Sequence, residues 1–240
     1  MAYGYKEYRD DLSGFSKDNF NLLSISDIHI PYNLPEEIFS KYSNNIDILV
    51  INGDILDCQE LSKFPKEYKI DFIDEIILAR EYLIRLIKLI NPKIIYINDG
   101  NHDIRFGNYI AKKMDNTINS LLPTSPIQMI VDSGFYHYDK MRNKQFFYKP
   151  LRKVFKCDIH YENNYFCVIG NVIFCHPSIY SSAIMGTSKK AMEYFNSQGI
   201  DYNVIVLGHT HKLGMYKYGN KTLIEQGCVV DINKLKYFKR

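Results

Sequence analysis

Two short apolar runs flank one long helical pattern, and this order of elements constrains the fold more than any other feature of the chain. The runs, residues 47–52 and 93–98, are rich in isoleucine and short enough to be buried strands. Between them, isoleucine and leucine recur at helical spacing from Asp71, which can cap the helix, to Asn91, where Asn-Pro ends it. Strand, helix and strand in this order predict a parallel β-α-β unit.

The second half of the chain carries hairpin signals. Each is a Gly-Asn pair between two apolar runs, which suits a tight turn. The predicted hairpins are 165–175 and 215–225, and the other predicted elements are strands at 20–26 and 204–207 and a helix at 188–198.

The length of 240 residues suits one domain with insertions. We expect a polar arm over residues 1–19 and one domain over 20–240. Within the domain, the segment 132–164 shows no clear period and is predicted to be an insertion or cap.

The composition favours a cytoplasmic protein without a membrane span. No apolar run approaches the roughly 20 residues that a span requires, and the first residues lack the apolar core of a secretory signal. The 5 cysteines are odd in number and lack C-x-x-C spacing, so we expect reduced thiols. The formal net charge of +3 permits a polyanionic partner without demanding one. The oligomeric state stays open.

Histidines gather at the ends of the predicted strands. Five of the 7 histidines directly follow apolar runs or stand in the next loop: His29, His102, His176, His209 and His211. Acidic and amide residues accompany them: Asp27, Asp54, Asp57, Asn101 and Asp103. Strand ends are where α/β sheets place functional groups. Imidazole, carboxylate and amide groups together can hold two divalent cations, whose mutual repulsion a shared carboxylate offsets.

Five ordered blocks resemble the motifs of the calcineurin-like metallophosphoesterases. They are Asp27-Ile-His29 for D-x-H, Gly53-Asp-Ile-Leu-Asp57 for G-D-x-x-D, Gly100-Asn-His-Asp103 for G-N-H-D, the lone His176, and Gly208-His-Thr-His211 for G-H-x-H. The resemblance spans residues 26–211. It implies a four-layer α/β/β/α sandwich of two mixed sheets, with the metal ions at the strand ends. It also implies attack on a phosphate ester by a hydroxide that the two metal ions bridge.

Carried over position by position, the resemblance implies a role for each residue. One metal ion would be held by Asp27, His29 and His211, the other by Asn101, His176 and His209, with Asp54 shared. The metals expected are two divalent ions, with manganese favoured and iron or zinc as alternatives.

The remaining motif residues would serve catalysis. His102 would face the substrate, and Asp57 would orient His102, unless Asp57 is a turn residue. Arg105 would bind a phosphate oxygen or be an exposed helix residue. Asp103 would have a supporting structural role.

Other candidates match no motif. His137 and His160 are expected to be surface residues. The sequence 186–189 lacks the spacing of a phosphate-binding loop and is better explained as a helix start capped by Thr187 or Ser188.

A basic segment is the second feature of functional interest. Residues 140–156 hold seven lysines or arginines and no acidic residue, with aromatic residues among them. This pattern suits single-stranded nucleic acid, and it equally suits a solvated cap whose aromatics pack inward.

The sequence therefore predicts a phosphodiesterase, with a nuclease included. A phosphomonoesterase acting on a small molecule or protein stays open, as does a metal-binding scaffold. Protein Ser/Thr phosphatase activity is disfavoured, because Cys58 and Gln59 stand where those relatives have Arg-Gly.

Overall fold

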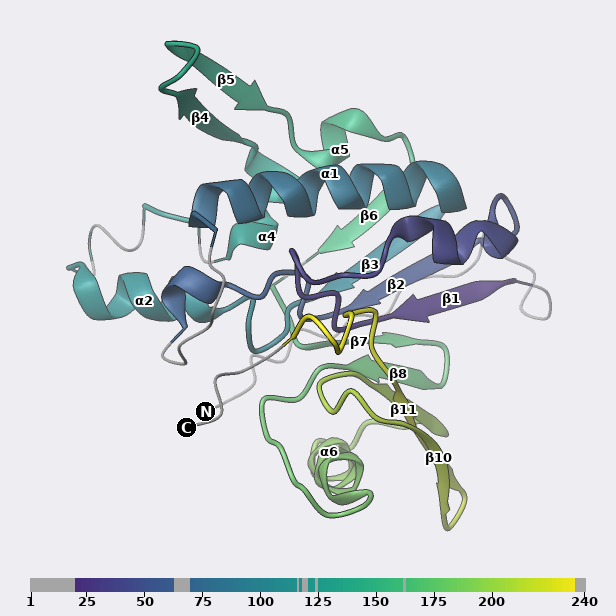
Figure 1. Cartoon of the computed structure of the whole chain (residues 1–240). Coiled ribbons are helices and arrows are strands. Elements are labelled where there is room, and N and C mark those ends of the chain that lie inside the picture. Colours follow the sequence, from purple (N-terminus) through teal and green to yellow (C-terminus); the bar gives the residue numbers. More distant parts are fainter. Residues whose placement is uncertain are drawn as a thin grey trace.

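Two β-sheets pack face to face and carry helices on their outer sides in the computed structural model (Figure 1). The structure describes residues 20–62, 70–115, 117, 121–123, 125–161 and 163–235. The predicted arm, residues 1–19, lies outside the described residues. The α/β class and the α/β/β/α layering agree with the sequence prediction.

The first sheet contains four strands in the order β1-β2-β3-β6. Their bounds are Leu22–Ile25, Ile48–Asn52, Ile94–Asn98 and Asp158–Tyr161. All neighbouring strands pair in parallel. The prediction of two mixed sheets is therefore wrong for this sheet in the described residues. The reason is that helices or long segments connect these strands, and such crossovers return the chain in the same direction.

The second sheet contains five strands in the order β10-β11-β9-β8-β7 and is mixed. The bounds of β7 to β11 are Phe166–Ile169, Val172–Cys175, Val204–Leu207, Leu213–Tyr218 and Lys221–Gln226. The two antiparallel pairs, β7 with β8 and β10 with β11, are the two hairpins predicted from their Gly-Asn turns. Strand β9 runs parallel to both β8 and β11.

Strand β2 shows why the layers form. Ile48 and Val50 point to the second sheet, where they join Tyr96 and Phe174 in one buried cluster. Leu49 and Ile51 point to the opposite side, where they join a second buried cluster with residues of helix α1 (Phe72–Ile90). Each fully buried side chain of this kind contributes roughly 1.5–3 kcal/mol. A strand that is apolar on both faces therefore holds the helix and the second sheet at once.

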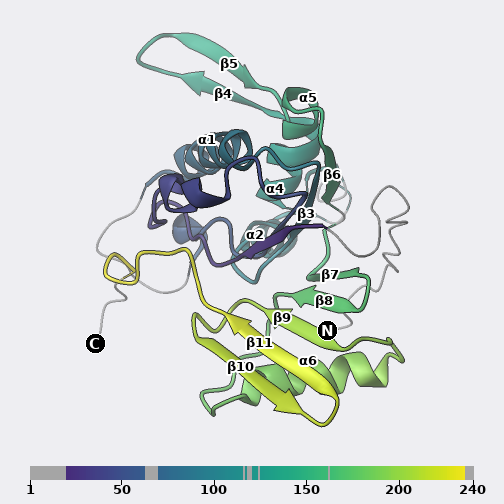
Figure 2. The ribbon, with the colours of Figure 1, turned by 90° about the vertical axis from the view of Figure 1, so that its right-hand side faces the viewer.

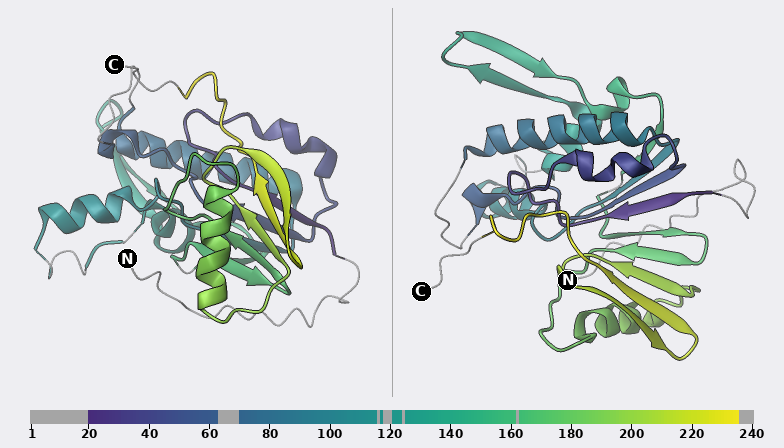
Figure 3. Two further views of the ribbon diagram at one scale, coloured as in Figure 1. Left: turned by 90° about the horizontal axis from the view of Figure 1, so that it is seen from below. Right: turned by 45° about the vertical axis from the view of Figure 1, so that its right-hand side comes forward.

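The helices lie on the outside of this sandwich, as Figures 2 and 3 show for α1 above the first sheet and α6 below the second. The bounds are Glu36–Tyr42 (η2), Gln59–Leu61 (η3), Arg105–Lys113 (α2), Pro126–Gln128 (α4), Met129–Ser133 (η4), Leu151–Val154 (α5) and Gly186–Ser197 (α6). No helix in these described ranges is long and apolar enough to cross a membrane.

Two helix starts differ from the prediction. Asp71 occupies the N-cap of α1, but its side chain makes no capping bond; the Glu60 carboxylate accepts from the Phe72 N–H at 2.8 Å instead. Helix α6 begins at Gly186, so Thr187 and Ser188 lie in its first turn rather than at its cap. The Thr187 hydroxyl accepts the Ser181 N–H at 2.9 Å, which ties the preceding loop to the helix.

The segment 132–164 is only partly separate from the sandwich. It contains a two-stranded hairpin, β4 (Phe135–Asp139) with β5 (Lys144–Tyr148), that forms its own small sheet. Its last part is β6, the fourth strand of the first sheet. The boundary at residue 164 is therefore wrong for 158–161. Asp158 and His160 alternate with apolar residues there, and this half-buried pattern is weaker than that of β2.

Candidate metal centre

The motif residues follow the carboxyl ends of strands from both sheets. The first sheet provides Asp27 and His29 after β1, Asp54 and Asp57 after β2, and Asn101 and His102 after β3; the second provides His176 after β8 and His209 and His211 after β9. Because β1, β2 and β3 run in parallel, their carboxyl ends meet at one edge. Strands β8 and β9 are parallel as well.

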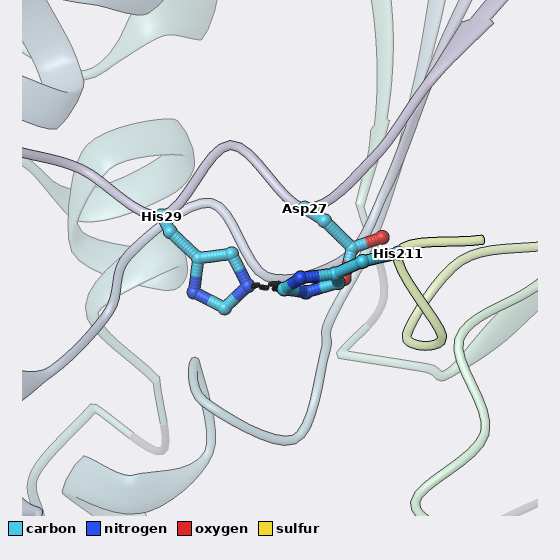
Figure 4. A group of neighbouring side chains, drawn as sticks. All are labelled: Asp27, His29 and His211. Carbon is cyan, nitrogen blue, oxygen red and sulfur yellow. Dashed lines mark hydrogen bonds and ion pairs between the residues drawn. The ribbon is translucent and has the colours of Figure 1, made fainter. Parts of the chain in front are cut away.

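Asp27, His29 and His211 form one group whose ligand atoms all lie within 4.8 Å of one another. Figure 4 shows the two imidazole rings directed at each other beside the Asp27 carboxylate. His29 Nε2 lies 3.1 Å from His211 Nε2, and His211 Nε2 lies 3.1 Å from Asp27 Oδ1. Asp27 and His29 are fully buried, so the group sits at the floor of the site.

Asp54, His176 and His209 form a second group of the same kind. His176 Nε2 lies 3.2 Å from Asp54 Oδ2. The same oxygen lies 3.7 Å from His29 Nε2 in the first group. The Asp54 carboxylate therefore stands between the two groups.

Three buried side-chain atoms at the site have no hydrogen-bond partner among the described residues: Asn101 Oδ1, His176 Nε2 and His209 Nε2. The partner of His176 Nδ1 is the Asn52 carbonyl at 2.8 Å, which can only accept, so Nδ1 carries a proton. A neutral His176 ring then presents the Nε2 lone pair to an Asp54 carboxylate oxygen. Two acceptors that face each other in a buried place fit a bound cation.

The backbone of the site is strained at non-glycine residues. Five motif residues have positive φ angles: Asp27 (55°), His29 (50°), Asp54 (53°), His209 (77°) and His211 (56°). Such conformations cost of order 1–3 kcal/mol each and gather at functional sites. The loops therefore hold these side chains against local preference.

The motif glycines allow the loops to approach one another. A Cβ atom on Gly100 would lie 2.1 Å from Asp54 Oδ1, and one on Gly53 would lie 2.5 Å from the His176 ring. Both distances are shorter than any real contact. Only glycine fits at these two positions beside the candidate ligands.

Asp57 contacts two imidazole rings. Its Oδ1 lies 3.2 Å from Nδ1 of His102 and 3.2 Å from Nδ1 of His29. The contact with His102 was expected from the motif, whereas the contact with His29 has no signal in the sequence. Asp57 thus links the first group to His102.

Arg105 is the first residue of α2 and turns toward the site. Its Nη1 donates to the Asp57 carbonyl at 2.8 Å, and its Nη2 lies 2.9 Å from His102 Nε2. The interpretation of Arg105 as an exposed helix residue is therefore wrong, since these contacts hold it over His102.

Charges inside the site oppose the effect of burial. Burial alone would raise the pKa of Asp54, but the charges of His176 and His102 hold it well below its usual value. Burial alone would lower the pKa of His176, but the charges of Asp54 and Asp27 raise it to about 9. In the absence of a metal ion, a proton on His176 thus balances the carboxylates, and a bound cation would take the place of that proton and leave the ring neutral. Burial and the charge of His176 lower the pKa of His209 to about 4, which leaves this ring neutral.

Two buried asparagines were missed at the sequence level. Asn52 and Asn98 end β2 and β3 and pair with each other, Asn98 Nδ2 donating to Asn52 Oδ1 at 2.8 Å. Asn52 Nδ2 also donates to the Cys175 carbonyl of β8 at 3.0 Å, and the Asn52 carbonyl accepts from His176. The signal was present: an amide ends each of two otherwise apolar strands.

Asp103 has the supporting contacts expected of it. Its carboxylate accepts the N–H groups of Leu56 at 3.0 Å and of Gly100 at 2.9 Å, so it ties two motif loops together. His137 and His160 join none of the candidate metal groups among the described residues. His160 stacks on Tyr96 in the first sheet, with ring centroids 4.8 Å apart.

The fold is that of the metallo-dependent phosphatases: a two-sheet sandwich with clustered histidines and carboxylates at its strand ends. The sequence model of the calcineurin-like phosphoesterase family matches residues 20–213, and the chain belongs to this family.

Solved structures of similar fold have low sequence identity to the chain. Vacuolar protein sorting 29 from Cryptosporidium parvum is 16% identical, over 88% of this chain and 77% of that one, with a TM-score of 0.42. Its counterpart from Chaetomium thermophilum is 12% identical, over 88% and 72%, with a TM-score of 0.40. A structure described as a novel archaeal phosphodiesterase is 14% identical, over 86% and 83%, with a TM-score of 0.34. No curated protein matches the chain.

Proposed function

We propose that this chain hydrolyses a phosphate ester with two divalent metal ions at the site described above. One ion is held by Asp27, His29 and His211, the other by Asn101, His176 and His209, and Asp54 is shared. The observation that carries the proposal is the buried pair His176 Nε2 and Asp54 Oδ2, 3.2 Å apart, where a cation can replace the proton that otherwise joins them. The unpartnered Asn101 Oδ1 and His209 Nε2 support it.

The chemistry follows from these groups. Two bound cations supply Lewis acidity toward the phosphate and lower the pKa of a water molecule. The donors are imidazole, carboxylate and amide, which suit manganese, iron or zinc; manganese is the ion we would test first.

The proposed role of His102 is to assist the leaving group. Its ring is held at Nδ1 by Asp57, and burial lowers its pKa, with the charges of His29 and Arg105 acting in the same direction. Its Nε2 faces Arg105 Nη2. If a phosphate oxygen pairs with this guanidinium instead, His102 Nε2 is free to take up a proton and pass it to the leaving oxygen. Arg105 is thus proposed to bind phosphate and to control access to His102.

We favour a phosphodiester substrate. The support is the basic segment 140–156, which suits a polyanion with more than one phosphate. A monoester of a small molecule or protein is the second candidate, supported by a site that needs only one phosphate group.

The first test compares bis-p-nitrophenyl phosphate with p-nitrophenyl phosphate, using metal-stripped protein with manganese added back. We expect manganese-dependent cleavage that favours the diester. Preference for the monoester would move the assignment to a phosphatase. Two bound metal ions without cleavage of either compound would contradict hydrolysis and favour a scaffold.

Two variants test the assigned roles. Asp54→Asn should lose metal ions and turnover together, because both groups use this carboxylate. His102→Ala should retain the metal ions and lose about 10²–10⁴-fold in rate. His137→Ala, at a histidine outside the site, is the matched control and should match the unmodified protein. Loss of metal from His102→Ala would contradict its role.

A further inference from the structure

The β4–β5 hairpin has an aromatic face that the described part of the chain leaves uncovered. Tyr136 pairs with Phe147 across the two strands, with ring centroids 4.7 Å apart. Tyr138 lies two residues further along β4 and therefore on the same face. These three side chains are 65%, 47% and 51% exposed, respectively.

The opposite face anchors the hairpin to the body. Phe135 stacks on Tyr148 with ring centroids 5.0 Å apart and is itself buried. From helix α1, Arg80 lies over the Tyr148 ring and donates through Nε to the Lys149 carbonyl at 2.9 Å. The hairpin is thus fixed by its inner face. Figures 1 and 3 show that the hairpin projects from the outer side of α1, the side that faces away from the two main sheets.

Positive charge surrounds the aromatic face. The stretch 135–149 holds four lysines or arginines and one acidic residue, Asp139. Asp139 accepts the N–H groups of Met141 and Arg142 and so orders the turn between the strands. The turn then presents Lys140 and Arg142 at the end of the aromatic face, whereas Lys144 lies on the opposite face, with its Nζ 5.3 Å from the centroid of the Phe146 ring.

We propose that the outer face of the β4–β5 hairpin binds single-stranded nucleic acid. Bases stack on Tyr136, Tyr138 and Phe147, and phosphates contact Lys140 and Arg142 of the turn. Exposed rings beside basic side chains match a ligand with flat apolar faces and regular negative charge. This inference is independent of hydrolysis, because the hairpin lies apart from the metal centre and binding there needs no metal ion.

Two other occupants fit the geometry less well. A duplex keeps its bases stacked on one another inside the helix, so they are not available to stack on the exposed aromatic rings. A membrane surface would need apolar residues at the tip, and the turn offers only Met141, while the rings lie along the strands. A protein partner would leave the basic residues at the end of the face without the regular anions that they suit.

The test measures fluorescence anisotropy of a labelled oligothymidylate of roughly 20 nucleotides, longer than the roughly 4–16 nucleotides that one small domain covers. Metal-stripped protein in chelator is used, so that hydrolysis does not interfere. We expect saturable binding that is stronger than binding to a duplex of equal length. The double variant Tyr136→Ala/Phe147→Ala should weaken binding on the order of 25-fold or more, because two stacking rings are lost and each contributes at least about fivefold.

The basic residues of the turn have their own readout. The double variant Lys140→Ala/Arg142→Ala should reduce the slope of log affinity against log salt by about 1.4, or about 0.7 for each lost phosphate contact. The matched controls are Tyr218→Ala and Lys217→Ala, which change exposed residues of the β10–β11 hairpin and should leave the affinity unchanged.

Several outcomes would overturn the inference. They are absence of binding, equal binding of duplex and single strand, equal loss in the control variants, or retention of affinity in Tyr136→Ala/Phe147→Ala. Association with anionic phosphatidylserine vesicles in place of the oligonucleotide would assign the face to a membrane surface. Cleavage of nitrophenyl esters is measured separately, so failure of binding leaves the hydrolysis result intact.

Discussion

At the scale of single residues, Asp57 has the contacts of a positioning group for two rings at once. Its carboxylate is fully buried and meets Nδ1 of both His29 and His102. Burial alone would raise its pKa, but hydrogen bonds with these two histidines hold it far below its usual value. The ionised carboxylate fixes the tautomer of His29. The carboxylate and the backbone carbonyl of Asp57 together hold Nδ1 of His102, the carbonyl at 3.0 Å, so that each Nε2 is left for its own function.

We therefore expect Asp57→Asn to disturb metal binding as well as catalysis. The amide retains the size of the side chain but loses the charge that orients His29 and His102. Manganese affinity should fall on the order of 10–100-fold, and kcat should fall even at saturating metal. Manganese titration followed by turnover of the nitrophenyl diester measures both effects.

The matched control for Asp57→Asn is Asp74→Asn, which changes an exposed carboxylate on α1. A fall in kcat with unchanged metal affinity would show that Asp57 positions His102 but is not needed to position His29.

The sequence identified the residues of the site better than their contacts. Nine motif residues could be found because the spacing of D-x-H, G-D-x-x-D, G-N-H-D and G-H-x-H is local. The contact of Asp57 with His29 and the bond from His176 to the Asn52 carbonyl are not local. They depend on how parallel strand ends approach in space, and no spacing along the chain encodes that.

At the scale of elements, helix α1 holds the loop after β2 through Glu75. This buried carboxylate accepts the N–H groups of Cys58 and, at 3.3 Å, of Gln59 at the start of η3. Burial raises the pKa of Glu75 from 4.5 to about 7, although the two N–H groups act against this shift. The helix therefore positions the residues that directly follow Asp57.

Glu75 should make the free energy of unfolding depend on pH. Its folded pKa is above its unfolded value, so the folded state binds more protons between these two values. Stability should fall as pH rises from about 4.5 to about 7, by an amount on the order of 3 kcal/mol, and then level off. Glu75→Gln should flatten this slope, as measured by urea unfolding at about pH 5 and about pH 8.

Glu193→Gln on the exposed side of α6 is the control and should leave the slope unchanged. A slope that persists in Glu75→Gln would show that other groups cause it.

Elements were predicted well where the apolar pattern is long or continuous. Strands β2 and β3 and helix α1 are buried throughout or along a wide stripe, and such patterns depend on few distant contacts. The β4–β5 hairpin was missed because Asp139-Lys-Met-Arg-Asn143 contains no glycine to mark its turn. Strand β6 was missed because it is only four residues long and alternates polar with apolar residues, which is a weak pattern.

At the scale of the whole molecule, two asparagines connect the sheets at their centre. Asn98 Nδ2 donates to Asn52 Oδ1 and, at 3.1 Å, to the Phe174 carbonyl of β8. Asn52 Nδ2 donates to the Cys175 carbonyl of the same strand. The pair thus couples β2 and β3 of the first sheet to β8 of the second, directly below the candidate metal centre.

This coupling is measurable in a double-mutant cycle. Asn52→Ala and Asn98→Ala should each destabilise the protein by about 1–3 kcal/mol, because buried carbonyl groups lose a donor. The double variant should lose less than the sum, since both residues belong to one network. Denaturant unfolding gives the three values, and Asn108→Ala on the exposed side of α2 serves as the control. Simple additivity would contradict the network.

Removal of divalent metal should lower the melting temperature. Each proposed ion binds groups from both sheets, so it stabilises only the folded state. At a metal concentration about 100 times Kd, the gain is about 2.7 kcal/mol for each ion. For a chain of this length, the gain from each ion corresponds to a rise in melting temperature of roughly 5–10 °C. Thermal unfolding with manganese and with chelator measures it, and Asp54→Asn should remove the shift. An equal shift in that variant would contradict the shared carboxylate.

Each candidate metal group joins residues that are far apart along the chain. His211 lies 182 positions after His29, and the second group needs Asp54 from the first quarter together with His176 and His209. A nascent chain leaving the ribosome therefore carries the early carboxylates for most of its synthesis without the late histidines. Neither candidate metal group is complete before the late histidines have been synthesised, so a product truncated before residue 176 would lack both groups.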